Sequence, residues 1–228
     1  YDDALNIHLD KVIPALDSLG LKGTFYLIGE SPVVSKRIPE WRIAAKDGHE
    51  LGNHSLMHPC NNSLPGRSWV GPDQELNKYT ATRAVNEIKV TNTLLEAIDG
   101  KTERTFAFPC GDTKIGSVNF YDDLKNDFVG ARGVQQNFQH TKEVDLNDIN
   151  CFYIDGHSGD YMIDLVKKAI ESNTLLVFLF HGVGGEHPIN VSAKAHKELL
   201  DFLKLHENEI WNAPMVDVAK FIGKNQKS

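Results

Sequence analysis

The sequence predicts one α/β domain of about six parallel strands, arranged as a barrel or a doubly wound sheet. Short apolar runs alternate with amphipathic stretches along all 228 residues, as strands do when helical crossovers join them. These runs are continuously apolar rather than alternating with polar residues, which is typical of parallel strands covered on both faces. No linker or internal repeat divides residues 1–228, so we expect a single domain.

The N-terminal half is expected to begin with a helix, because apolar residues recur at helical spacing up to Gly20. Pro14 predicts a kink or a helix start within it. Prolines and glycines between residues 59 and 76 predict a long loop. The expected elements are a helix at 4–19, a strand at 23–29, a helix at 39–47, a strand at 49–54, and a long helix at 74–98.

The C-terminal half continues the alternation of strands and helices. We expect strands at 105–108, 128–131, 151–154 and 175–180, helices at 161–172 and 192–207, and a short strand near 211–215. The run at 175–180 is the most apolar, yet it is far shorter than the ~20 residues that span a bilayer. No membrane span is therefore expected, and no signal peptide opens the chain.

Composition excludes several classes of protein. The chain has 24 Lys+Arg and 31 Asp+Glu, and this net charge of −7 argues against a nucleic-acid partner. Hydrophobic residues (41%) and charged residues (24%) have the proportions of an ordinary globular protein. The cysteines Cys60, Cys110 and Cys151 have no Cys-x-x-Cys spacing, which excludes a structural zinc ribbon.

Polar residues gather directly after the predicted strands and at the start of the chain. In parallel α/β folds the carboxyl ends of the strands share one face, and binding sites are built there. We therefore expect the following groups to converge: Asp2 and Asp3, residues 53–55, residues 109–112, residues 155–157, and His181 with Gly182.

His54 and His58 are four residues apart, and two imidazoles with a carboxylate form a common ligand set for a catalytic divalent metal. Ordinary core or surface histidines are the alternative interpretation. His181, at the end of the most apolar strand, is either a core residue or an acid–base group. Asp2 and Asp3 either cap the following helix or serve two roles, one on a metal and one on a water.

Two common site types are absent from the sequence. The glycines of residues 182–185 lack a following Lys-Ser/Thr pair, so they do not form a phosphate-binding loop. No Gly-x-Ser-x-Gly motif occurs, which argues against a serine hydrolase of the α/β type.

Four segments together resemble the motifs of the polysaccharide deacetylases, carbohydrate esterase family 4, with their nodulation-protein-B-like domain. They are residues 1–4 (Tyr-Asp-Asp-Ala), 54–58 (His-Ser-Leu-Met-His), 106–111 (Phe-Ala-Phe-Pro-Cys-Gly) and 178–181 (Phe-Leu-Phe-His). The resemblance spans nearly the whole chain. It implies a distorted (β/α) barrel of about seven parallel strands, in which the first strand would precede Tyr1.

The resemblance assigns roles to the site residues. Asp3, His54 and His58 would bind a divalent metal, most often Zn²⁺, with Co²⁺, Mn²⁺ and Ni²⁺ as alternatives. Asp2 matches the general base of the family, and His181 matches its general acid.

The third motif departs from the family pattern. The backbone N–H of Cys110 matches the family's oxyanion donor, although an aromatic residue is usual there. Ala107 stands where the family carries an arginine that pairs with the base. Our hypothesis is that Arg132 supplies this guanidinium from a neighbouring strand.

The fourth motif matches only loosely. Asp155 or Asp160 is expected to orient His181, with helix capping by Asp160 as the alternative. Trp69, in the long loop, is expected either to stack on a sugar or to pin the loop, and Pro109 is expected to line the substrate site. Cys60 and Cys110 border site motifs, and they form either a disulfide or two free thiols.

The implied function is a metal-dependent hydrolase that removes acetyl groups from an N- or O-acetylated polysaccharide. One alternative is a hydrolase of another small linear or cyclic amide on the same fold. The other is a glycan-binding homologue without catalysis, suggested by Ala107. By family habit the protein would be periplasmic, exposed at the cell surface or secreted.

Overall fold

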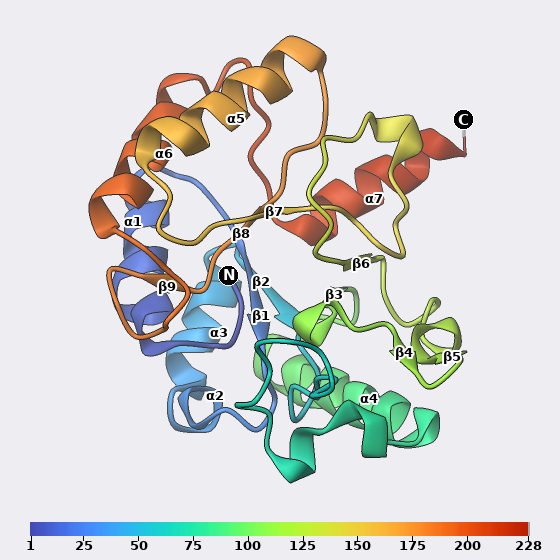
Figure 1. Ribbon diagram of the computed structural model, residues 1–228. Coiled ribbons are helices and arrows are strands. Elements are labelled where there is room, and N and C mark those ends of the chain that lie inside the picture. The colour runs from blue at the N-terminus through green and yellow to red at the C-terminus, as the bar shows by residue number, and fades with distance from the viewer. Residues whose placement is uncertain (228) are drawn as a thin grey trace.

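Parallel strands form the centre of the computed structural model, which describes residues 1–227 (Figure 1). The main sheet has the order β1-β2-β3-β6 and consists of β1 (Thr24–Leu27), β2 (Glu50–Asn53), β3 (Thr105–Ala107) and β6 (Gly130–Arg132). A second parallel pair consists of β7 (Phe152–Tyr153) and β8 (Phe178–Leu179). The predicted α/β fold with a parallel central sheet is confirmed.

Backbone hydrogen bonds connect the two sheets at both edges. The Ile149 N–H, just before β7, donates to the carbonyl of Ala131 in β6 over 2.8 Å. On the other side, Asp2 donates to the carbonyl of Phe180 (2.9 Å) and Asp3 to that of Tyr26 (3.1 Å). Residues 1–3 thus lie between β8 and β1, and the strands follow one another in a ring.

Two small pairs of strands lie outside this ring. They are the antiparallel pair β4 (Lys114–Ile115) and β5 (Val118–Asn119), and the parallel pair β9 (Gly182–Val183) and β10 (Asn190–Val191).

Helices surround the strands (Figure 1). A π-helical turn (His8–Val12) leads into α1 (Ile13–Ser18), and the other helices are α2 (Pro32–Lys36), α3 (Ile38–Lys46), α4 (Ala81–Asp99), α5 (Gly159–Ser172), α6 (Ala193–Leu205) and α7 (Met215–Gln226). Thr80, Ser158 and Ser192 cap the N-termini of α4, α5 and α6 with their hydroxyl oxygens. Among the helices of residues 1–227, none is both long and apolar enough to cross a membrane.

Aromatic side chains fill two core clusters. Trp41 from α3 is fully buried against Phe25 of β1. A second cluster beneath α4 packs Phe106, Tyr121 and Phe128 together.

Two expectations from the sequence are wrong. The long helix begins at Ala81 rather than residue 74, since two short 3-10 turns (Pro72–Gln74 and Leu76–Lys78) precede it. The expected strand near 211–215 is an irregular segment that leads into α7, and Trp211 is 58% exposed.

The start of α7 depends on side chains far away in the sequence. The Met215 N–H donates to Oγ1 of Thr24 over 2.8 Å, and the Val216 N–H donates to Oε2 of Glu50 over 2.8 Å. These acceptors satisfy amides that a helix N-terminus leaves free. Since both acceptors belong to the first residues of β1 and β2, local sequence patterns could not reveal this helix start.

Candidate active site

The side chains expected at the site converge at the carboxyl ends of the strands. Asp2 and Asp3 lie beside β1, His54 follows β2, Arg132 ends β6, and His181 follows β8. Several residues here have left-handed backbone conformations. Such conformations are strained in residues other than glycine, and they concentrate at functional sites. They are Asp3, Ala4, Ser55, His58, Cys110 and Glu186.

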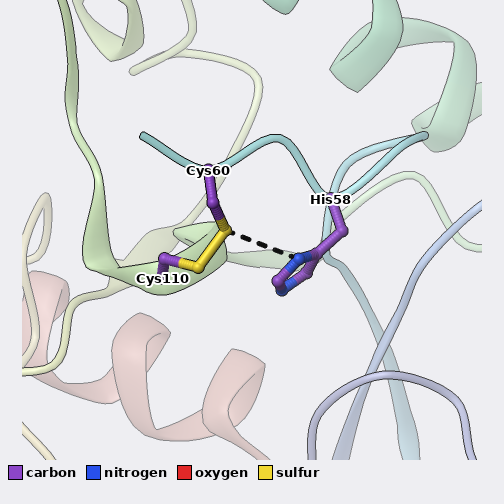
Figure 2. A group of neighbouring side chains, drawn as sticks. All are labelled: His58, Cys60 and Cys110. Atoms are coloured by element: carbon purple, nitrogen blue, oxygen red, sulfur yellow. Dashed lines mark hydrogen bonds between the residues drawn. A yellow bond between two sulfur atoms is a disulfide. The ribbon is translucent and has the colours of Figure 1, made fainter. Parts of the chain in front are cut away.

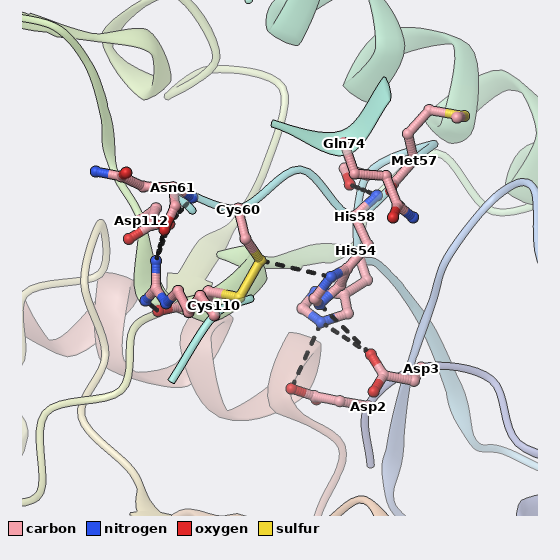
Figure 3. The surroundings of a disulfide bond; sticks show 12 residues. Asp2, Asp3, His54, Met57, His58, Cys60, Asn61, Gln74, Cys110 and Asp112 are labelled. Carbon is pink, nitrogen blue, oxygen red and sulfur yellow. Dashed lines mark hydrogen bonds and ion pairs between the residues drawn. A yellow bond between two sulfur atoms is a disulfide. The ribbon is translucent and has the colours of Figure 1, made fainter. Parts of the chain in front are cut away.

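Asp3, His54 and His58 form one cluster of potential metal ligands (Figure 3). Oδ1 of Asp3 lies 3.5 Å from Nε2 of His54 and 3.6 Å from Nε2 of His58. Within residues 1–227 this buried oxygen accepts no hydrogen bond. A divalent cation with ligand distances of about 2.0–2.2 Å fits between these three atoms and would satisfy the oxygen.

Both histidines present the nitrogen that a metal requires. Nδ1 of His54 lies 2.8 Å from the carbonyl oxygen of Ala107, which holds the proton on Nδ1 and leaves Nε2 free. Nδ1 of His58 faces Sγ of Cys60 at 3.6 Å (Figure 2). Burial lowers the pKa of His54 to about 4, so its imidazole is neutral at physiological pH, as a metal ligand must be.

Asp2 forms a buried ion pair with Arg132. Nη2 of Arg132 lies 2.5 Å from Oδ2 of Asp2, and both side chains are almost fully buried. Burial alone would raise the pKa of Asp2, but the charge of Arg132 holds that pKa well below its ordinary value. The other oxygen, Oδ1, is buried and accepts no hydrogen bond from residues 1–227. Asp2 is therefore an ionised carboxylate with one free oxygen at the site.

Tyr26 and Gly52 support the position of Arg132. The guanidinium of Arg132 lies 5.3 Å from the centroid of the Tyr26 ring, whose hydroxyl contacts Oγ1 of Thr105 at 2.8 Å. A Cβ atom at Gly52 would lie only 2.5 Å from this ring. Glycine at residue 52 therefore leaves the space that the ring occupies.

His181 faces Asp3, but neither predicted carboxylate orients it. Nε2 of His181 lies 3.8 Å from Oδ2 of Asp3, and burial lowers the pKa of His181. Its Nδ1 is buried and makes no hydrogen bond within residues 1–227. Asp155 instead accepts from the backbone N–H of Asn190 at 3.1 Å, and Asp160 is exposed in the first turn of α5. Within residues 1–227 no hydrogen bond joins either carboxylate to His181, and the loop after β7 turns Asp155 toward β10.

His187 joins the site without having been expected. Its Nε2 lies 3.6 Å from Oδ2 of Asp3, and its ring stacks on that of His181 with centroids 4.8 Å apart. The sequence signal was a histidine six residues after His181, beyond a glycine-rich stretch. Only the folded loop shows that it returns to Asp3.

Cys60 and Cys110 form a disulfide that ties the loop after His58 to the loop after β3 (Figures 2 and 3). Of the two alternatives open from the sequence, pairing is therefore the one found. Arg67 Nη2 donates to the Cys110 carbonyl over 2.9 Å, and its Nη1 lies 2.5 Å from Oδ2 of Asp112. This pair, also not expected from the sequence, fixes the turn that carries the Cys110 amide.

Trp69 and Pro109 border the ligand cluster. Trp69 is 57% exposed, and its ring centroid lies 6.2 Å from that of His58. Pro109 is buried and begins the short turn Pro109–Gly111. Trp69 thus offers an exposed aromatic face beside a candidate ligand, whereas Pro109 shapes the turn that carries Cys110.

A comparison with known protein families identifies the family of this chain. Its residues 1–129 match the model of the family described as "Polysaccharide deacetylase", which is more than half of the chain. The chain belongs to this family. It is also 32% identical over 114 residues to the uncharacterized protein YlxY of Bacillus subtilis (strain 168). That match covers 50% of this chain and only 30% of YlxY.

Solved structures show the same fold. A mutant of the peptidoglycan deacetylase PdaC from Bacillus subtilis has a TM-score of 0.58 at 16% identity, covering 100% of this chain and 90% of PdaC. The peptidoglycan N-acetylglucosamine deacetylase Bc1960 has a TM-score of 0.59 at 18% identity, covering 96% and 85%. The pseudoenzyme BA3943 from Bacillus anthracis has a TM-score of 0.54 at 18% identity, covering 96% and 63%. Proteins named as deacetylases and one named as a pseudoenzyme thus share this fold.

Proposed function

We propose that this member of the polysaccharide deacetylase family is a metal-dependent hydrolase that releases acetate from an N- or O-acetylated glycan. The observation that carries the proposal is the pair of buried carboxylate oxygens, Oδ1 of Asp2 and Oδ1 of Asp3, that accept no hydrogen bond within residues 1–227. Buried polar atoms are nearly always satisfied, and unpaired ones are typical of sites completed by an ion or a substrate. Asp3 faces two histidines while Asp2 faces an arginine, so the two carboxylates suit different tasks.

The proposed cation is Zn²⁺, held by Asp3, His54 and His58; this ligand set also suits Co²⁺, Mn²⁺ or Ni²⁺. When bound, the cation would polarise the acetyl carbonyl and make a water molecule more acidic. Asp2 then acts as the general base, because Arg132 keeps it ionised and Oδ1 is free to accept the proton of the attacking water.

The remaining proposed roles concern the oxyanion and the leaving group. The backbone N–H of Cys110 donates to the negative oxygen that develops on the acetyl carbon. His181 gives a proton to the departing amine or alcohol, since it faces Asp3 from the side of β8. Trp69 offers its exposed face to a sugar ring near His58.

A second candidate function is glycan binding without catalysis. The likeness of the fold to the pseudoenzyme BA3943 and the loss of the motif arginine at Ala107 favour this candidate. Against it, Arg132 supplies a guanidinium to Asp2, and mere binding requires neither this pair nor His181.

The proposed location is outside the cytoplasm. The Cys60–Cys110 disulfide supports it, because disulfides persist in oxidising compartments and are rare in reducing ones. The likeness to a peptidoglycan deacetylase is in keeping with this location.

Acetate release tests the proposed function. We expect the Zn²⁺-loaded protein to release acetate from at least one of peptidoglycan, chitin oligomers and acetylated xylan, and the chelator-stripped protein to release none. Asp2→Asn should bind Zn²⁺ as wild type does but turn over about 10²- to 10⁴-fold more slowly, since it lacks the base.

Three outcomes would contradict the proposal. Failure to release acetate from all three substrates, with one equivalent of metal bound, would favour the glycan-binding homologue. Turnover of a small cyclic or linear amide, but of no glycan, would favour the other hydrolase. An Asp3→Ala variant that keeps both metal and activity would exclude the proposed ligand set.

A further inference from the structure

His187 stands out as the histidine nearest Asp3 that the proposed mechanism does not use. The two oxygens of Asp3 face different partners: Oδ1 faces His54 and His58, whereas Oδ2 faces His181 at 3.8 Å and His187 at 3.6 Å. A carboxylate ligand whose second oxygen is unconstrained can rotate and lose its orientation toward a metal. Partners of the second oxygen prevent this in metal sites generally.

The hydrogen bonds of the loop define which nitrogen of His187 carries the proton. Nδ1 of His187 lies 3.1 Å from the Ile189 N–H and 3.2 Å from the Ile189 carbonyl oxygen, and this carbonyl also accepts from the Gly182 N–H at 3.0 Å. The shorter contact favours Nδ1 as an acceptor, since a backbone N–H can only donate and the carbonyl has Gly182 as its donor. The neutral ring then carries its proton on Nε2, the nitrogen that faces Asp3.

The loop that carries His187 is anchored on the segment that follows Asp3. The carboxylate of Glu186 accepts from the backbone N–H groups of Asn6 (3.0 Å) and Ile7 (2.5 Å) and from Nδ2 of Asn6 (2.7 Å). At the base of the loop, a Cβ atom on Gly182 would lie 2.4 Å from the Gly185 carbonyl oxygen, so only glycine allows this turn. His187 is thus held toward Asp3 from both ends of the loop.

We propose that His187 is a positioning residue that donates its Nε2–H to Oδ2 of Asp3 and so keeps Oδ1 directed at His54 and His58. A movement of about 0.5 Å brings the two atoms within hydrogen-bond range. This inference rests on the proposed metal site, but not on acetyl release. The His187 ring also stacks on His181, with 13° between the planes. Variants must therefore distinguish the loss of this stacking from the loss of the hydrogen bond.

Zn²⁺ affinity measured by competition with a chromophoric chelator tests this role without turnover. His187→Phe keeps an aromatic ring beside His181 but has no donor, whereas His187→Gln keeps an N–H donor and loses the ring. We expect Phe to weaken Zn²⁺ binding about tenfold or more, and Gln to stay within about threefold of wild type. Thermal unfolding of the metal-free proteins checks that both variants fold, and Asp3→Ala shows that the measured Zn²⁺ is at this site.

Three results would overturn the role. Unchanged affinity in His187→Phe would show that Asp3 needs no such donor. Equal losses in Phe and Gln, with an altered visible spectrum of the Co²⁺ forms, would show that His187 itself binds the metal. If Asp3→Ala binds Zn²⁺ as wild type does, the metal site of the proposed function fails and this role fails with it. Absence of acetyl release with normal Zn²⁺ binding would instead count against the proposed reaction alone.

Discussion

At the residue scale, two adjacent carboxylates have different electrostatic environments. Asp3 lies among histidines, whereas Asp2 is paired with a buried arginine at 2.5 Å. Removing one partner of such a pair leaves an uncompensated buried charge, while removing both is often nearly neutral. The pair at Asp2 and Arg132 therefore contributes to both stability and chemistry.

Arg132→Met should lower the free energy of unfolding by about 3–5 kcal/mol, because Asp2 would remain buried without its counter-charge. Urea unfolding of the metal-free protein at pH 7 measures this. The double variant Asp2→Asn with Arg132→Met should recover much of the loss. A single variant within about 1 kcal/mol of wild type would show that the pair is energetically unimportant.

Unchanged turnover in Arg132→Ala would contradict the hypothesis that Arg132 replaces the motif arginine.

At the scale of elements, loops rather than strands complete the site. The disulfide joins the loop after His58 to the turn that carries Cys110, and Glu186 joins the loop after β9 to the segment after Asp3. The disulfide and the hydrogen bonds of Glu186 each connect two segments that carry different residues of the site. Their contribution is to orient ligands that the strands only bring near one another.

Breaking the disulfide should separate its contribution to stability from its contribution to Zn²⁺ affinity. Closing a loop of 50 residues corresponds to about 4 kcal/mol in the chain-entropy model, so Cys60→Ala and Cys110→Ala should each lose several kcal/mol of stability. Zn²⁺ affinity should fall further in Cys60→Ala, since Cys110→Ala retains the sulfur that faces Nδ1 of His58. Chemical unfolding and chelator competition give the two quantities. Equal affinities in both variants would show that this sulfur does not orient His58.

At the scale of the whole molecule, buried neutral histidines link stability to pH. Burial lowers the pKa of His8 to about 3 and that of His196 to about 4. In the unfolded chain both titrate near 6.5. Between pH 6.5 and about 4 the unfolded state therefore binds more protons, and stability must fall as the pH falls.

Urea unfolding of the metal-free protein at pH 7.5, 6.0 and 4.5 should show a steady loss of stability. His196→Gln should lose less over this range, because glutamine can keep the contact with the Tyr1 hydroxyl, 2.7 Å from Nε2 in wild type, without titrating. The effect of Asp2 lies lower, since a carboxylate with a lowered pKa contributes stability that is lost only below about pH 4. Identical pH profiles of the two proteins would contradict the assignment to His196.

The sequence by itself determined the parallel α/β architecture and the face that carries the site. Continuous apolar runs identify strands covered on both sides, and the polar residues after them must meet where parallel strands end. For this reason Asp3 and His54 could be placed on one face before their distances were known, while the choice of Asp3, His54 and His58 as a ligand set came from the resemblance to the family. The fold class and the shared face of these residues follow from local sequence patterns, which can be recognised without knowledge of contacts between distant residues.

Only the tertiary structure decided which side chains face one another within that site. The pairing of Cys60 with Cys110, the approach of His187 to Asp3 and the hydrogen bond from Asn190 to Asp155 all depend on the paths of loops. Loop paths are determined by contacts between residues far apart in the sequence, such as the bonds of Glu186 to residues 6 and 7. Sequence periodicity carries no record of such contacts, so they emerge only when the whole chain is folded.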